Sequence, residues 1–124
     1  GIDTATSAKE AGLIISDRTQ PGITRQIIEI PPKEEGDKVK IEWKYKFPDG
    51  KLLKDKSRIT MLNSLAVPPA WTDVWFDKKG NGHIQATGYD GKGRLQYRYH
   101  PEWVKKRADD KFANVDEFAE NYQN

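Results

Sequence analysis

The decapeptide KVKIEWKYKF, residues 38–47, decides the fold class of this chain. Apolar side chains alternate along it with four lysines and a glutamate, so that Trp43 and Tyr45 share one side with Val39, Ile41 and Phe47. A period of two over ten residues is typical of a β-strand. The decapeptide therefore predicts a strand with an apolar face and a basic face, ended by a turn at Pro-Asp-Gly, residues 48–50.

Working outward from this strand, the sequence predicts further elements on both sides. Further strands are expected over residues 25–30, 72–77, 83–87 and 94–100, the last three joined by two glycine-containing turns. Helices are expected over residues 58–65 with Ser57 as N-cap, over 101–112 and over 114–122. The result is an α+β fold, a small antiparallel β-sheet of about five strands with a few short helices, two of them at the C-terminal end.

Composition excludes several classes of protein. A chain of 124 residues is one domain's worth, and its thirteen aromatic residues can anchor a core. It has no cysteine and two histidines, which excludes disulfides and Cys-based zinc sites and argues against a His-rich metal site. No apolar run approaches the ~20 residues of a membrane span, and no signal peptide is recognisable. We therefore expect an intracellular protein that does not contact a membrane.

The net charge of +2 conceals two basic blocks. Residues 38–58 hold eight basic and three acidic side chains, a net +5, and residues 89–107 hold six and two, a net +4. The two ends of the chain are acidic. This distribution indicates a basic face for a polyanion; the alternative is an ordinary solvated surface of mixed sign.

The segment GKGRLQYRY, residues 91–99, has the side chains of a nucleic-acid contact. Its two glycines allow the backbone to approach a ligand closely. Alternation puts Arg94, Gln96 and Arg98 on one face, with His100, and the other face carries Leu95, Tyr97 and Tyr99. Arginine and glutamine can read base edges, and tyrosine can bond a phosphate or pack on a base. The alternative is that the leucine–tyrosine face is core and the basic face is only solvated.

Other chemistries lack their motifs. No glycine-rich phosphate loop of the P-loop or dinucleotide-binding type is present, and no GxSxG nucleophile motif accompanies the two histidines. The residues by themselves therefore indicate a binding domain and not a self-contained enzyme.

Several blocks of the sequence, in order, resemble the N-terminal domain of bacterial, poxvirus-like type IB DNA topoisomerases. These blocks are LAVPPAWTDVW (65–75), GHIQAT (82–87), GYDGKGR (88–94) and QYRYH (96–100). The resemblance implies a clamp around duplex DNA in which a C-terminal domain cuts and rejoins one strand through a 3′-phosphotyrosine. It implies no ATP, metal or other cofactor. It places the catalytic residues outside these 124 residues, so that this piece alone is inactive.

The resemblance also implies which side chains meet DNA. Together with Arg98, which the alternation places on the basic face of this strand, the predicted DNA-binding residues are Lys92, Arg94, Gln96, Tyr97, Arg98 and Tyr99. Leu95 stands where relatives often have a basic residue, and residues 30–40 depart from the family pattern. Gln96 and Tyr97 point to opposite faces of a flat strand, so both could reach DNA only if the strand enters the groove edge-on or is sharply twisted.

We therefore expect a DNA-clamping lobe: residues 1–24 loosely ordered, residues 25–112 the DNA-binding domain, and residues 113–124 the start of the connection to the catalytic domain. The expected partners are duplex DNA and that C-terminal domain of the same polypeptide, in a monomer of the bacterial cytoplasm, at the nucleoid. Two alternatives stay open, a stand-alone module that binds single strands by stacking and a docking domain for an acidic protein.

Overall fold

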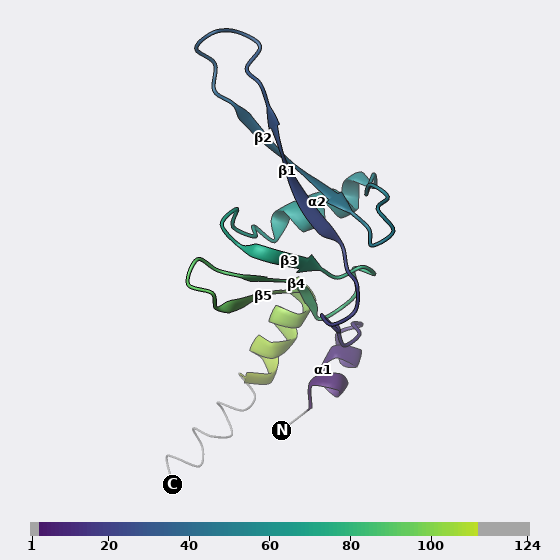
Figure 1. Cartoon of the computed structure of the whole chain (residues 1–124). Helices are drawn as coiled ribbons and strands as arrows, with labels where there is room; N and C mark the ends of the chain where they lie inside the picture. The colour runs from purple at the N-terminus through teal and green to yellow at the C-terminus, as the bar shows by residue number, and fades with distance from the viewer. Residues whose placement is uncertain (1–2, 112–124) are drawn as a thin grey trace.

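The computed structural model of the chain, shown in Figure 1, describes residues 3–111. Its elements are α1 (Thr4–Glu10), β1 (Thr24–Ile30), β2 (Lys40–Lys46), α2 (Lys56–Ser64), β3 (Thr72–Phe76), β4 (Ile84–Tyr89), β5 (Leu95–Tyr99) and the helical residues 101–111. All strand pairs are antiparallel, and the predicted α+β class is confirmed. The helix predicted over 114–122 lies outside the described residues. None of the helices in the described part is long and apolar enough to cross a membrane.

The five strands form two sheets and not the single sheet that the sequence predicted. One sheet is the hairpin β1-β2, and the other has the order β3-β4-β5. Within residues 3–111, one backbone bridge, between Ile23 and Phe76, joins the two sheets. On the N-terminal side of Phe76, β3 carries a bulge between Thr72 and Trp75, and a bulge bends and twists a strand. From the bridge onward, β1 diverges from β3. The hairpin consequently rises from the body as an arm (Figure 1).

The core lies where the base of this arm meets β3 and α2. Ile23, Leu62 and Phe76 are almost entirely buried. The ring of Tyr45 meets that of Phe76 edge-on, with centroids 5.3 Å apart, and its hydroxyl group donates to Asn63 Oδ1 at 2.7 Å. Burial raises the pKa of Tyr45 above its ordinary value. This one cluster fastens β2, β3 and α2 together.

The start of α2 differs from the prediction. Asp55, and not Ser57, is the N-cap: its Oδ1 accepts hydrogen bonds from the backbone amides of Ser57 at 3.0 Å and Arg58 at 3.2 Å. Both residue types are favoured at this position, so composition alone could not choose between them. The helix therefore begins two residues earlier than predicted.

The structure describes residues 3–24 of the segment for which the sequence predicted loose order, and it places the helix α1 within them. Ala8 of α1 is buried against Trp103. The hydroxyl group of Ser16 donates to the carbonyl of Ile84 at 2.7 Å and accepts from its amide at 3.1 Å. These are contacts between residues far apart in the chain, which local periodicity does not reveal.

The outer half of the arm leaves its apolar face uncovered. Tyr45 is 4% exposed, whereas Ile41 is 58% and Val39 54% exposed. The alternation along residues 38–47 correctly predicted a strand, but burial of its apolar face is confined to the part near the body. The reason is that α2 and β3 cover the base of the arm and not its outer half.

Candidate nucleic-acid interface

Strand β5 has a free edge. It lies at the end of the order β3-β4-β5 and pairs with β4 alone among the described strands. An edge strand offers its outer backbone groups and side chains from both of its faces to a partner. The free edge therefore leaves open the edge-on approach that contact of both Gln96 and Tyr97 with one ligand would require.

The two faces of β5 have different surroundings. Arg98 is opposite Ala86, which belongs to the hydrophobic core, whereas Tyr97 is opposite Thr87, which is also buried but lies on the other side of the sheet. Tyr97 is 38% exposed and Tyr99 41% exposed. The interpretation of these tyrosines as core residues is therefore wrong, because the core lies on the side of Gln96 and Arg98.

Tyr97 and Tyr99 together form an exposed aromatic surface, here called the tyrosine platform. Their rings are stacked, with centroids 6.0 Å apart and planes at 15°. Two nearly parallel rings on an exposed strand present flat apolar faces and two hydroxyl groups. Such a surface can pack on sugars or bases and donate hydrogen bonds to phosphate oxygens.

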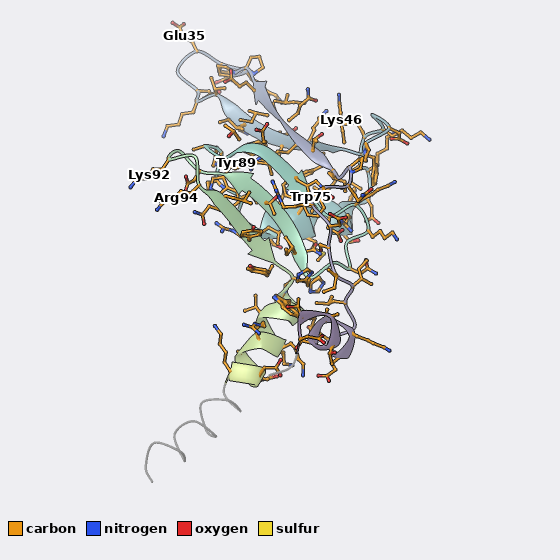
Figure 2. The ribbon with its side chains drawn as sticks, turned by 60° about the horizontal axis from the view of Figure 1, so that its bottom comes forward. Glu35, Lys46, Trp75, Tyr89, Lys92 and Arg94 are labelled. Atoms are coloured by element: carbon orange, nitrogen blue, oxygen red, sulfur yellow. The ribbon has the colours of Figure 1, made fainter. Side chains whose placement is uncertain are left out.

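The turn before β5 presents two cations and is organised by Asp90. Lys92 and Arg94 are exposed, and Figure 2 shows them at the tip of this turn. Oδ1 of Asp90 accepts from the amides of Lys92 at 2.9 Å and Arg94 at 3.0 Å. Gly93, with φ of +75°, adopts the left-handed conformation that the turn requires. The loop therefore has a defined shape that holds both cations outward.

The second oxygen of Asp90 holds two of the predicted site residues. It accepts from Arg94 Nε at 3.2 Å and from Gln96 Nε2 at 3.0 Å. Hydrogen bonds from the Arg94 amide, the Gln96 side chain and the Lys92 amide, with the charge of Arg94, hold the pKa of Asp90 below its ordinary value. The sequence analysis missed this residue as part of the site, although an aspartate two residues before a lysine-glycine pair is a turn signal.

Arg98 is placed differently from the other predicted residues. Its Nε donates to the carbonyl of Leu65 at 3.0 Å, and its guanidinium group lies 4.7 Å from the ring centre of Trp71. Arg98 thus ties β5 to the core side of the sheet, away from the tyrosine platform. The structure brings Lys92, Arg94 and Gln96 together around Asp90.

A groove of about 600 Å³ continues from the tyrosine platform toward the C-terminal helical residues. Tyr99 lines it together with Trp103, Val104, Arg107 and Lys111. Arg107 and Lys111 are exposed, so the groove has cationic side chains along the helix. Spacing along the sequence did not single out this groove because it is formed between a strand and a helix.

Metal-binding chemistry has no visible site in the part of the chain that the structure describes. Among residues 3–111, no three histidine, aspartate or glutamate side chains gather closely enough to hold an ion. The chemistry that the interface offers is that of cations, amides and tyrosine hydroxyls, which is suited to binding a polyanion.

Comparison with known proteins gives two matches. Residues 42–90 match the family described as bacterial DNA topoisomerase IB, N-terminal domain. Over 63 residues, which are 51% of this chain, the sequence is 41% identical to DNA topoisomerase 1B of Acanthamoeba polyphaga mimivirus. The aligned part spans 19% of that viral protein, so this chain corresponds to about a fifth of it. The family match runs from β2 to the turn before β5 and ends at Asp90.

Proposed function

We propose that this chain is the non-catalytic lobe that clamps duplex DNA in a bacterial type IB DNA topoisomerase, because residues 42–90 match the N-terminal domain of that family. The observation that carries the proposal is the free edge of β5, which presents the tyrosine platform beside the Lys92–Arg94 turn. Cations that neutralise phosphates beside groups that meet base edges are the two components of DNA recognition.

In the proposed complex the turn positions the lobe and the strand sets its register. Lys92 and Arg94 neutralise backbone phosphates, and Gln96, held by Asp90, meets base edges in the major groove, which is wide enough for a β-ribbon. Tyr97 and Tyr99 contribute hydroxyl groups to phosphates from the other face of the strand. Edge-on entry of β5 allows both faces to act at once. The sequence also predicted a DNA contact for Arg98. That contact stays a prediction, and it is not favoured because the Arg98 side chain already interacts with Trp71 and the Leu65 carbonyl.

The rest of the proposed enzyme belongs to a C-terminal domain of the same polypeptide, which holds the tyrosine nucleophile. We expect the 124-residue chain alone to be a monomer, to act at the bacterial nucleoid as part of that polypeptide, and to leave supercoiled plasmid unchanged. A plasmid relaxation assay tests the last point directly. Relaxation by the purified chain would contradict the assignment of this lobe as non-catalytic.

The binding site itself is tested by titrating duplex DNA into the isotope-labelled chain and following backbone amide shifts. We expect the largest shifts over residues 92–99, with a dissociation constant in the non-specific range of ~10⁻⁴–10⁻⁶ M. Arg94→Gln should lower the slope of log K against log salt by about 0.9, since one phosphate contact is lost. Lys78→Gln, in the turn between β3 and β4, removes the same charge elsewhere and should leave the slope unchanged. Shifts confined to other residues would overturn the site.

A second candidate function is favoured by the tyrosine platform alone, because stacked exposed rings also suit single strands. Competition between duplex and single-stranded DNA of the same length separates the two. The clamp proposal predicts preference for the duplex, and preference for the single strand would replace it. Binding of an acidic protein, the third alternative, would gain support if Lys92→Ala and Arg94→Ala both left duplex binding intact.

A further inference from the structure

The β1-β2 arm and the three-stranded sheet share one core side. Directly opposed residues of an antiparallel ladder point to the same side, and successive residues alternate. The bridge between Ile23 and Phe76 therefore puts both on one side, and both are fully buried. Arg25, two residues after Ile23, points the same way, and its partner Tyr45 belongs to the same core. The core side thus continues from the sheet onto the base of the arm.

The opposite, outer side of the arm carries lysines. Lys44 and Lys46 flank the buried tyrosine of β2 and so point away from the core. In the three-stranded sheet the side opposite the core carries the ladder of Trp75, Thr87 and Tyr97, of which Thr87 is fully buried and Tyr97 is exposed. Lys44 and Lys46 therefore lie on the same side of the molecule as the tyrosine platform.

The outer side has cations at both ends and between them. In the described part of the chain, neither Lys44 nor Lys46 takes part in an ion pair. Figure 2 shows Lys46 near the base of the arm, away from the turn that carries Lys92. Between them the exposed Arg18 donates from Nε to Thr87 Oγ1 at 3.4 Å, beside the platform. A polyanion lying across this side would meet these cations, and on β2 it would also pass the exposed Glu42, which points the same way as Lys44 and Lys46.

We infer that the arm supplies a second phosphate contact to duplex DNA, made by Lys44 and Lys46 and separate from the Lys92–Arg94 turn. The inference rests on the proposed function, because it takes the ligand of the platform to be a duplex. Charge complementarity supports this occupant: residues 38–58 carry a net +5, and the part of that block on β2 points to the platform side. The arm accordingly extends the clamp beyond β5, and the duplex contacts both sheets at once.

The test compares the salt dependence of duplex binding by three forms of the 124-residue chain. Lys44→Gln/Lys46→Gln removes the proposed arm contacts, and Lys78→Gln/Lys79→Gln removes two exposed charges of the same sign in the turn between β3 and β4. We expect the arm variant to lower the slope of log K against log salt by about 1.8, which corresponds to binding weakened about 60-fold at 0.1 M salt when the two forms bind equally at 1 M salt. The control variant should retain the slope of the unmodified chain. Amide spectra of both variants establish that the fold is retained.

The possible results separate this inference from the proposed function. An arm variant with an unchanged slope, alongside an Arg94→Gln variant that loses about 0.9, overturns the arm contact and leaves the proposed function standing. Equal losses in the arm and control variants also overturn it, because the effect would then be one of net charge. Absence of duplex binding by the unmodified chain overturns both.

Discussion

The guanidinium group of Arg98 lies against the indole ring of Trp71, 4.7 Å from its centre, on the side of β5 opposite to the exposed Tyr97 and Tyr99. Its Nε also donates to the carbonyl of Leu65. Arg98, the one cation within the described β5, is therefore part of the packing of the domain. In this interface a positive charge is a guide to DNA contact only when the face that carries it is also known.

Replacing Arg98 should affect stability more than binding. Arg98→Met keeps much of the aliphatic stem but loses the interaction with Trp71 and the hydrogen bond to Leu65. We expect the free energy of unfolding to fall by about 1–3 kcal/mol, with the salt slope of duplex binding unchanged. Urea unfolding and a binding titration measure the two quantities. A slope lowered by a full contact in a stably folded variant would assign Arg98 to the DNA.

Replacing Asp90 should separate the shape of the turn from its charge. Asp90→Asn keeps the oxygen that accepts from the amides of Lys92 and Arg94, whereas Asp90→Ala removes it. We expect residues 91–94 to stay ordered in the asparagine variant and to become mobile in the alanine variant, as reported by amide relaxation. Equal order in both variants would contradict this role.

The same carboxylate predicts a pH dependence of the turn. Because its folded-state pKa is lowered, the stabilisation is fully present above the unfolded-state value of ~3.9 and is lost as the pH falls through the lower folded-state value. Amide shifts of Lys92 and Arg94 should therefore titrate with Asp90, at a pH below the ordinary midpoint of an aspartate. A midpoint at or above that ordinary value would contradict the hydrogen-bonded arrangement.

The tyrosine platform can act through its hydroxyl groups or through its rings, and Tyr97→Phe distinguishes the two. The clamp proposal assigns the hydroxyl group to a phosphate, so removing it should weaken duplex binding by about 2- to 13-fold, the equivalent of 0.5–1.5 kcal/mol. Because Tyr97 is exposed, stability should change by less than about 0.5 kcal/mol. Undiminished binding by Tyr97→Phe, together with loss in Tyr97→Ala, would show that the ring face is the contact.

Mild acid should destabilise the domain through His83. Nδ1 of His83 accepts from the amide of Ser16 at 3.0 Å, and burial lowers the pKa of its imidazole below the ordinary value. Below pH ~6.5, the pKa of histidine in the unfolded chain, the unfolded chain binds a proton more readily than the folded chain does. The free energy of unfolding is therefore full above that pH and falls below it, by at most about 1.4 kcal/mol per pH unit. Urea unfolding at pH 7.5 and 5.5 measures this fall.

The control for that experiment is His83→Gln, which removes the titrating group. The second histidine, His100, also has its pKa lowered by burial, so part of the pH dependence should persist in the variant. An unchanged pH dependence in His83→Gln would assign the whole effect to His100 or to the carboxylates.

The fold was predictable where a single element carries its own signal. The alternation over residues 38–47 and the glycine turn before β5 were both correctly located, because strand period and turn chemistry are local properties. Which face of β5 packs against the core could not be predicted from the local sequence. Alternation defines two faces equally well, and only the packing of Ala86 and Trp71 against one of them shows which face is inward.

The candidate site was named from the sequence as a segment, and its geometry could not be predicted in that way. The sequence pointed to residues 92–99, but the role of Asp90 depends on a reach of six residues to Gln96 across the turn. The direction of Lys44 and Lys46 depends on the Ile23–Phe76 bridge, which joins residues 53 positions apart in the chain. Neither relationship has a signature in composition or spacing.

The tip of the arm, residues 31–39, is exposed at every position and takes no part in either core cluster. Glu35 stands at its far end in Figure 2, and the chain has no cysteine of its own. Glu35→Cys would therefore introduce a unique thiol for a fluorophore or spin label, far from the residues that hold the domain together. The arm thereby offers a position for a spectroscopic reporter of the proposed duplex binding, placed outside the residues that the proposal assigns to the contact.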